Sequence, residues 1–276
     1  MVETIPLAGS QAGETLAATE LPTVRDASGY VVSESDLEFL RISDESVVAW
    51  ASRQVPLGMT PLNYADVVRR LVHALERECL EGRSALDDAD VRLQGSSAHF
   101  FSNRSKPMCF TREAIASEFM SHGLSPSMPT IGQIDGVLTQ LETQWPCDHP
   151  RPAYRPFDVM FRVGVHVAPS DYDFQVSSSL LVNIIRAEIG FESVDPDMFD
   201  YTNSTYSFVK KNLVVQYLRY LWAWSEIATS IVGRPVNLAL FDSSGPPRVE
   251  PNSDDPEPLS SHFQDTDWVI AVRSGT

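Results

Sequence analysis

The sequence predicts an α+β fold, close to the α/β type, in which helices flank a small mixed sheet. Apolar residues recur at helical spacing in several stretches, and short runs of β-branched and aromatic residues lie between them. Hydrophobic residues make up 43% of the 276 residues and charged residues 21%, as in ordinary globular proteins. A chain of this length and composition carries enough apolar surface for a sizeable core.

The N-terminal part predicts a tail followed by a helix. Residues 1–29 are rich in Ala, Thr, Glu, Gly and Ser without sustained periodicity, which indicates a flexible tail. Residues 33–52 favour a helix with Ser33 as its N-cap, because acidic residues follow Ser33 in the first turn, where the helix dipole stabilises them. We expect residues 30–276 to form a single domain.

A second helix has clearer signals. Thr60 and Pro61 are residue types that favour the N-cap and the first helical position. Apolar residues then follow at helical spacing, and Cys79 belongs to their pattern. The pattern predicts a helix over residues 60–81 with Cys79 in the core.

A short strand and an irregular insert come next. Residues 90–94 (DVRLQ) predict a strand that runs into a Gly-Ser-Ser turn and a helix. The Pro-rich residues 103–157 are expected to be an insert that contains two helices, over 111–122 and 131–144.

The following segment predicts two strands and two long helices. Residues 157–167 alternate weakly and residues 171–176 more clearly, which indicates strands. Apolar spacing then predicts helices over residues 178–189 and 208–232, and Gly233 is typical of a residue just past a helix end.

The C-terminal part predicts two further strands. Residues 236–241 (VNLALF) indicate a buried strand, and residues 267–272 a short last one. Between them, the acidic, Pro-rich residues 248–259 indicate a mobile loop.

Charge and cysteine content exclude several function classes. The net charge of −16 repels phosphate backbones, so extended binding of DNA or RNA is not expected. No stretch approaches the roughly 18–20 apolar residues that cross a bilayer, and residues 1–23 lack a secretory signal. Three widely spaced cysteines fit a reducing cytoplasm, and the absence of a Cys/His quartet with ligand spacing argues against a structural zinc site.

The Gly95-Ser96-Ser97 turn is a candidate phosphate site. A Gly-Ser turn before a helix lets backbone N–H groups and a hydroxyl approach a phosphate closely, and a helix N-terminus adds a favourable dipole. Such a turn is also a common connection between a strand and a helix, so by itself it has a purely structural interpretation as well.

Asp171 and Asp173 are candidate metal ligands. Side chains alternate along a strand, so an Asp-x-Asp pair projects both carboxylates from one face. Two carboxylates at a strand end suit Mg²⁺ bound to nucleotide phosphates. Alone, the pair has a second interpretation as exposed caps of the turn after Pro169.

The sequence resembles the nucleotidyltransferase superfamily with the DNA-polymerase-beta-like fold. Three segments carry the resemblance: the Gly-Ser turn, the motif Ser-Asp-Tyr-Asp-Phe over residues 170–174 and the later strand over residues 236–241. That superfamily includes minimal nucleotidyltransferases and cyclic-oligonucleotide synthases. The resemblance covers residues 90–102 and 157–242. It implies that Gly95, Ser96 and Ser97 bind the nucleotide.

The sequence departs from this family pattern at two places. Asp171 follows Gly95 by 76 positions, far more than the usual spacing, so residues 103–157 would be an insertion. Asn237 stands where the family has a third carboxylate. Asparagine offers a carbonyl oxygen but neither a general base nor a negative charge, and Asp242 is a possible substitute as a third metal ligand.

The resemblance implies a metal-dependent transferase. It would take a nucleoside triphosphate such as ATP, with Mg²⁺ or Mn²⁺, transfer the nucleoside monophosphate to a hydroxyl and release pyrophosphate. The acceptor stays open between a second nucleotide, a small alcohol, a protein side chain and an RNA end. Lys210 and Lys211 are candidates for contacting the triphosphate. By family analogy alone, bacterial members of this size serve in defence or toxin systems.

Two alternatives remain. Asn237 favours a catalytically impaired relative that acts as a nucleotide-sensing or protein-interaction module. The other alternative is an interaction protein without a nucleotide site. A geometric criterion bears on all of these interpretations: the nucleotidyltransferase hypothesis requires Asp171 and Asp173 within about 8–10 Å of Gly95, a distance set by triphosphate and metal–oxygen dimensions.

Overall fold

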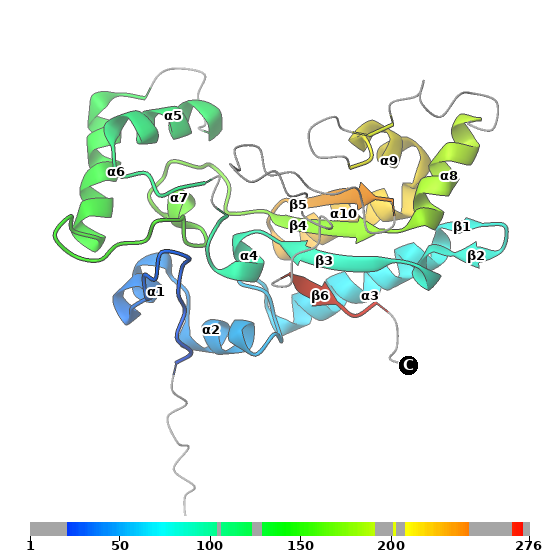
Figure 1. Cartoon of the computed structure of the whole chain (residues 1–276), viewed down its shortest axis with the longest axis horizontal. Helices are drawn as coiled ribbons and strands as arrows, with labels where there is room; N and C mark the ends of the chain where they lie inside the picture. Colours follow the sequence, from blue (N-terminus) through cyan, green and yellow to red (C-terminus); the bar gives the residue numbers. More distant parts are fainter. Residues whose placement is uncertain are drawn as a thin grey trace, which may run out of the picture.

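A four-stranded mixed sheet with the strand order β5-β4-β3-β6 lies at the centre of the computed structural model (Figure 1). The structure describes residues 21–103, 106–122, 129–190, 201–202, 208–242 and 267–272. The strands are β3 (Asp90–Gln94), β4 (Tyr172–Ser177), β5 (Val236–Phe241) and β6 (Trp268–Ile270). The predicted α+β class and the mixed sheet are confirmed.

The pairing of the strands brings distant segments to one end of the sheet. Strand β3 runs antiparallel to β4 and β6, whereas β4 and β5 are parallel. Gln94, at the end of β3, pairs with Asp173, and Asp173 pairs with Asn237. The end of β3 and the beginnings of β4 and β5 therefore meet.

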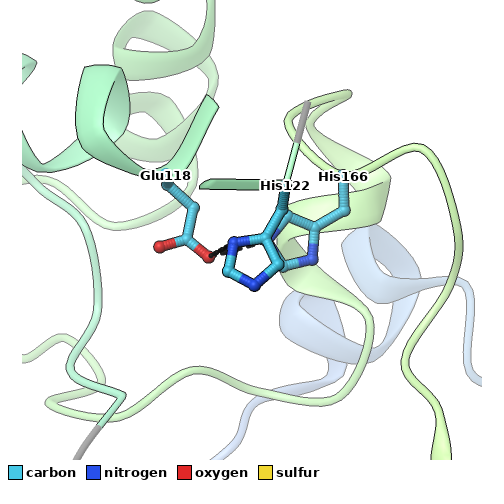
Figure 2. Close-up of side chains that lie close together, drawn as sticks. All are labelled: Glu118, His122 and His166. Carbon is cyan, nitrogen blue, oxygen red and sulfur yellow. Dashed lines mark hydrogen bonds and ion pairs between the residues drawn. The ribbon is translucent and has the colours of Figure 1, made fainter. Parts of the chain in front are cut away.

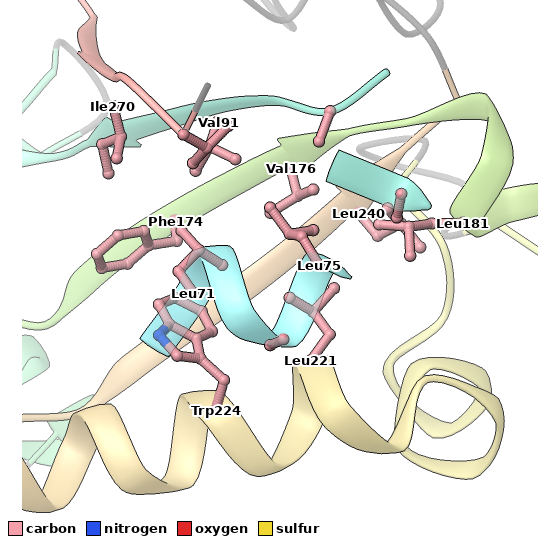
Figure 3. Close-up of a cluster of buried hydrophobic side chains, with 14 of the residues drawn as sticks. Leu71, Leu75, Val91, Phe174, Val176, Leu181, Leu221, Trp224, Leu240 and Ile270 are labelled. Carbon is pink, nitrogen blue, oxygen red and sulfur yellow. The ribbon is translucent and has the colours of Figure 1, made fainter. Parts of the chain in front are cut away.

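One face of the sheet is apolar and packs against helices α3 (Pro61–Arg77) and α10 (Arg219–Val232) (Figure 3). Phe174 contacts Trp224 edge-on at 5.0 Å, and the Trp224 indole donates to the Val67 carbonyl at 3.0 Å. Burial of this face is the main stabilising contribution, since each large apolar side chain contributes about 1.5–3 kcal/mol. The opposite face carries polar side chains, among them Asp173 and Gln175.

Helix α3 begins as predicted but ends earlier. The Thr60 hydroxyl accepts from the Asn63 amide and Pro61 is the first helical residue. The helix stops at Arg77, and a hairpin of β1 (Cys79–Leu80) and β2 (Arg83–Ser84) follows. Cys79 is exposed, so its predicted place in the core is wrong. The chain turns there because Glu81 and Gly82 adopt positive φ angles of 52° and 78°.

The helices between β4 and β5 differ in part from the prediction. Helix α8 (Ser179–Ile189) is capped by Ser178. The long helix expected over 208–232 is two helices, α9 (Lys211–Tyr217) and α10, because the fully buried Leu218 between them leaves the helical conformation, with φ −111° and ψ 66°. Gly233 ends α10 in the left-handed region, as predicted.

Two strand predictions need correction. Strand β5 lies at the edge of the sheet, with Asn237 exposed, and is therefore only partly buried. Residues 157–167 contain helix α7 (Val159–Arg162) instead of a strand. Five of their apolar side chains face one hydrophobic cluster: Phe157, Val159, Met160, Val163 and Val165. A single helical turn and a tight bend achieve this, and an extended strand does not.

A second hydrophobic cluster lies beside the sheet and is built from helices (Figure 1). Its helices are α1 (Glu34–Leu40), α2 (Asp44–Ala51), α5 (Arg112–His122), α6 (Ile131–Gln144) and α7. The segment between β3 and β4 thus packs with the N-terminal helices, and we call this region the helical lobe. The helix expected over 33–52 is two helices, because Arg41 adopts φ 57° and Ser43 starts a new helix.

The predicted N-terminal tail is ordered in the part that the structure describes. The Asp26 carboxylate accepts from the backbone amides of Ser28, Tyr30 and Ala153 at 2.8–2.9 Å. These bonds attach residues 21–29 to the helical lobe, so that part is not a flexible tail. Residues 1–20 and the predicted loop over 248–259 lie outside the described residues.

The remaining short elements are the 3-10 turn η1 (Ala85–Asp87) and helix α4 (Ser96–His99). No helix in the described ranges is long and apolar enough to cross a bilayer.

Candidate functional site

Two carboxylates and one amide meet at the end of the sheet. The Asn237 Nδ2 donates to Asp171 Oδ2 at 2.6 Å and to Asp173 Oδ1 at 3.2 Å. Asp171 and Asp173 lie on one face because they are two residues apart at the start of β4. Asn237 reaches both because it pairs with Asp173 on the neighbouring parallel strand.

Gly95 lies against this carboxylate pair. Its backbone has φ 83° and ψ −173°, a conformation that is essentially restricted to glycine. A Cβ atom at Gly95 would be 3.3 Å from Asp173 Oδ2. The Gly-Ser turn and the Asp-x-Asp pair are therefore adjacent despite the long insert between them, and Asp173 satisfies the criterion of about 8–10 Å from Gly95.

The carboxylate pair concentrates negative charge in a partly buried place. Burial raises the pKa of the Asp173 carboxyl above its usual range, and the neighbouring Asp171 charge raises it further. The hydrogen bond from Asn237 and the charge of Lys106 act in the opposite direction without cancelling the effect. A divalent cation bound by these oxygens would relieve the repulsion.

A buried ion pair fixes the beginnings of β4 and β5. Arg234 donates to both carboxylate oxygens of Asp158, at 2.8 and 2.7 Å. Asp158 also accepts from the Ser170 amide at 2.8 Å, and its side chain has no exposed surface. Ser170 immediately precedes Asp171, and Arg234 lies just before β5. Asp158 and Arg234 are therefore positioning residues for the carboxylates and for Asn237.

Tyr172 provides a second anchor between the two aspartates. Its hydroxyl donates to the Leu57 carbonyl at 3.1 Å, and the side chain is fully buried. Gly58 makes room for it: a Cβ there would be 2.8 Å from both the Tyr172 hydroxyl and the Phe157 ring. Because Tyr172 points into the core, Asp171 and Asp173 point to the opposite face of the sheet.

Sequence reasoning missed these positioning residues. Asp158 and Arg234 are 76 positions apart and lie in no motif, so no local pattern connects them. The only available signal was that Arg234 interrupts an otherwise apolar approach to β5. Lys106 also belongs to no motif, and its charge acts on Asp173.

The structure modifies the prediction for the turn itself. Ser96 is half-buried and begins α4, which has only four residues, so its helix dipole contributes little. Ser97 is fully buried and its carbonyl accepts from the Leu57 amide at 3.0 Å. The Ser97 hydroxyl is buried and has no hydrogen-bond partner among the described residues, so its assignment as a nucleotide-binding residue stays a prediction.

Three further predicted residues lie at the other end of the sheet. Asp242 follows the last residue of β5 and binds Ser179 at 2.9 Å and Arg186 at 3.0 Å. It is five residues beyond Asn237, roughly 16 Å along a strand, so it cannot share a metal ion with Asp171.

Lys210 and Lys211 are also distant from the carboxylates. They begin α9 just after Val209, whose amide donates to the Leu240 carbonyl near the end of β5 at 2.8 Å. The Lys211 ammonium lies 4.9 Å from the centre of the Trp222 ring. The structure does not bring either lysine to the site.

No protein-family model, curated protein or solved structure matches the chain. The nucleotidyltransferase hypothesis therefore depends on the placement of the residues themselves.

Proposed function

We propose that the protein is a metal-dependent nucleotidyltransferase, which transfers a nucleoside monophosphate from a nucleoside triphosphate to a hydroxyl acceptor and releases pyrophosphate. One observation carries the proposal. Four residues from three neighbouring strand ends converge at one end of the sheet. They are Gly95 just after β3, Asp171 and Asp173 at the start of β4, and Asn237 on β5.

The donor set fits a hard divalent cation. Asp171 and Asp173 offer carboxylate oxygens, the ligands that Mg²⁺ and Mn²⁺ prefer. Burial, and after it the Asp171 charge, raises the pKa of Asp173, and a bound cation would counter both effects. When bound there, such an ion would polarise the phosphate under attack and neutralise charge on the departing pyrophosphate.

The chain's own groups have separate tasks in this proposal. Asn237 orients both carboxylates through its amide. Gly95, lacking a side chain, lets phosphate oxygens approach the backbone. The hydroxyl of the adjacent Ser96 and the exposed Lys106 ammonium, whose charge acts on Asp173, would supply donors. Cytoplasmic ATP is a suitable donor nucleotide, and the acceptor stays open between a nucleotide, a small alcohol, a protein side chain and an RNA end.

Asn237 favours a second candidate function, that of a nucleotide-sensing module without turnover. An amide in place of a third carboxylate brings no charge and cannot remove a proton from the acceptor. A protein of this kind would bind nucleotide and metal through Asp171 and Asp173 and release no pyrophosphate.

The first experiment measures pyrophosphate release from the four ribonucleoside triphosphates with Mg²⁺ or Mn²⁺. Wild type is compared with Asp171→Ala/Asp173→Ala and with Asp242→Asn, which changes the carboxylate just after β5, at the distant end of the strand. We expect release in wild type and Asp242→Asn and none in the double variant. If wild type is silent with each class of acceptor added in turn, but binds nucleotide by calorimetry in a metal-dependent manner, it is a sensor. The absence of both activities would contradict both proposals.

Asn237→Asp is the sharper test between enzyme and sensor. The substitution adds a third carboxylate beside Asp171 and Asp173 without changing the side-chain size. In a sensor it should create pyrophosphate release, whereas in a working enzyme it should change an existing rate. Without metal the variant should melt below wild type because three carboxylates repel one another, and Mg²⁺ should restore its stability.

A further inference from the structure

The helical lobe contains a second group of ligand-bearing side chains (Figure 2). Glu118 and His122 lie one turn apart on α5, and His166 lies on the loop between α7 and β4. His166 Nε2 is 2.7 Å from Glu118 Oε1, and His122 Nδ1 is 3.3 Å from the same oxygen. The two imidazole rings are 4.7 Å apart at an angle of 32°.

These distances are close to those of a metal centre. The three ligand atoms all lie within 4.8 Å of one another. Ligand atoms around a tetrahedral zinc ion are separated by about 3.3 Å, since the zinc–nitrogen and zinc–oxygen bonds are about 2.0–2.2 Å long. Small side-chain rotations would therefore place all three atoms around one ion. The i, i+4 spacing of Glu118 and His122 provides two ligands on one helix face.

We propose that Glu118, His122 and His166 bind one divalent first-row transition metal ion of the zinc type, at a site separate from the carboxylates of the sheet. Two imidazoles and one carboxylate form a donor set that suits Zn²⁺, Co²⁺ or Ni²⁺ better than Mg²⁺. The ion would take the place of the proton that His166 and Glu118 now share.

Arg155 orients the Glu118 carboxylate through two hydrogen bonds. Its guanidinium donates to Glu118 Oε1 at 2.5 Å and to Oε2 at 2.8 Å. Donors of this kind orient a ligating carboxylate in metal sites. The bond to Oε2 can persist when an ion takes Oε1, so Glu118 stays fixed while it ligates.

Cys109 is not part of the donor set. Its Sγ lies 3.4 Å from Arg155 Nη2, and burial raises the pKa of its thiol. The ligand atoms that lie within 4.8 Å of one another belong to Glu118, His122 and His166, and no cysteine sulfur of the described residues joins this group. The site therefore has nitrogen and oxygen ligands, with a remaining position on the solvent side, where His122 is 56% exposed.

A metal ion here would connect α5 to the loop that leads into β4. His166 lies five residues before Asp171. The proposed role is structural: the ion would hold that loop against the helical lobe. This inference does not depend on the proposed transferase activity.

The experiment titrates Zn²⁺ into the full chain against a chromophoric chelator. All proteins carry the Asp171→Asn/Asp173→Asn background, which removes the other candidate site. We expect one ion per chain, and His166→Ala and His122→Ala should weaken binding about 100-fold or more, since even outer ligand partners contribute 10–100-fold. His149→Ala, an exposed histidine beside Asp148, is the matched control and should leave binding unchanged.

Co²⁺ gives a second readout. Its visible spectrum should indicate tetrahedral coordination without the charge-transfer band of a thiolate ligand, and His122→Ala should abolish it. His122 is on the surface, so this variant should fold, which circular dichroism verifies. The proposal is overturned if the Asp171→Asn/Asp173→Asn protein binds no Zn²⁺, if both histidine variants bind as tightly as that protein, or if the Co²⁺ spectrum shows sulfur ligation.

Discussion

Asp173 and Glu118 are both largely shielded carboxylates, yet their surroundings act on them in opposite ways. Asp173 shares its place with Asp171, and burial together with that second charge raises its pKa. Glu118 is also opposed by burial, but hydrogen bonds from His166 and Arg155 hold its pKa at about 2. Charge compensation by neighbours, more than burial, determines the difference.

The difference indicates which cation each place suits. At the end of the sheet negative charge is in excess and the ligand atoms are oxygens, so a hard divalent ion completes the site. In the helical lobe the carboxylate already has cationic partners, and nitrogen atoms complete its surroundings, so a metal ion has to replace a proton. The two regions thus predict different metal selectivity within one chain.

The largest expected effect comes from Asp158→Ala, which breaks the connection between the two regions. Asp158 stands at the N-cap position of α7 in the helical lobe, without a side-chain capping bond, and pairs with Arg234 beside β5. Removing one partner of a buried ion pair costs about 3–5 kcal/mol, because the other charge stays buried alone. Urea unfolding should show this loss, and nucleotide binding by folded protein should also weaken.

Asp148→Ala is the control for Asp158→Ala. Asp148 is 76% exposed and pairs only with its neighbour His149 among the described ion pairs, so its loss should leave stability within about 0.5 kcal/mol of wild type. Equal stability of the two variants would contradict the positioning role of Asp158.

Gly95→Ala should have the next largest effect and should act on the sheet end alone. The positive φ of 83° and the 3.3 Å approach to Asp173 Oδ2 make any side chain unfavourable. We expect a loss of about 1–3 kcal/mol in unfolding free energy and weaker nucleotide binding, without any change in zinc binding.

Gly136→Ala provides the opposite control for this substitution. Gly136 lies inside α6, and a Cβ there would meet nothing within 4 Å. Alanine should stabilise that helix by about 0.5–1 kcal/mol. If Gly95→Ala were equally harmless, the close approach of the turn to Asp173 would be contradicted.

Asp173→Asn should stabilise the metal-free protein while it removes Mg²⁺ binding. It relieves the repulsion with Asp171 and keeps an oxygen that accepts from Asn237. The gain should be about 0.5–1 kcal/mol, the scale of like-charge contacts between strand side chains. Thermal melting with and without Mg²⁺ measures both effects. A destabilised metal-free variant would contradict the excess of negative charge at this end of the sheet.

The sequence was informative where local rules decide the structure. Strand β3 and helix α6 have the predicted bounds, and Ser33, Thr60 and Gly233 cap helices as expected. These elements depend on alternation, apolar spacing and capping, which are local properties.

The sequence was uninformative where long-range packing decides. Residues 157–167 contain a helical turn because they pack against the helical lobe, and no local sequence pattern predicts this packing. The pairing of β3 with β4 brings Gly95 to Asp173 at one end of the sheet. Asp242 and Lys210 lie instead near the last residues of β5, at the other end, and the order of the motifs along the chain does not distinguish the two ends. The Glu118, His122 and His166 group was missed because His166 is 44 positions beyond His122 in the sequence, and Glu118 and His122 alone, four residues apart on one helix, are not a metal motif.

The smallest effect is a pH dependence that tests the opposite signs of the two carboxylates. The Glu118 pKa falls from an ordinary 4.5 to about 2 on folding, so its stabilisation is present above pH 4.5 and is lost as the pH falls towards 2. The deficit of Glu118→Gln relative to wild type should shrink over that interval. Asp173 behaves oppositely, because its pKa rises on folding. The ionised Asp173 therefore destabilises the folded state at a pH above the raised pKa, and this effect is absent at a pH below the ordinary pKa of an aspartate.

The advantage of Asp173→Asn over wild type should therefore disappear on acidification, at a higher pH than the deficit of Glu118→Gln does. Urea unfolding between pH 7 and about 2.5, without metal, measures both differences on the same three proteins. The order of the two transitions is the decisive result. If the Glu118→Gln deficit disappeared first, the carboxylate at the sheet end would be the better compensated of the two, and the assignment of different metals to the two regions would be wrong.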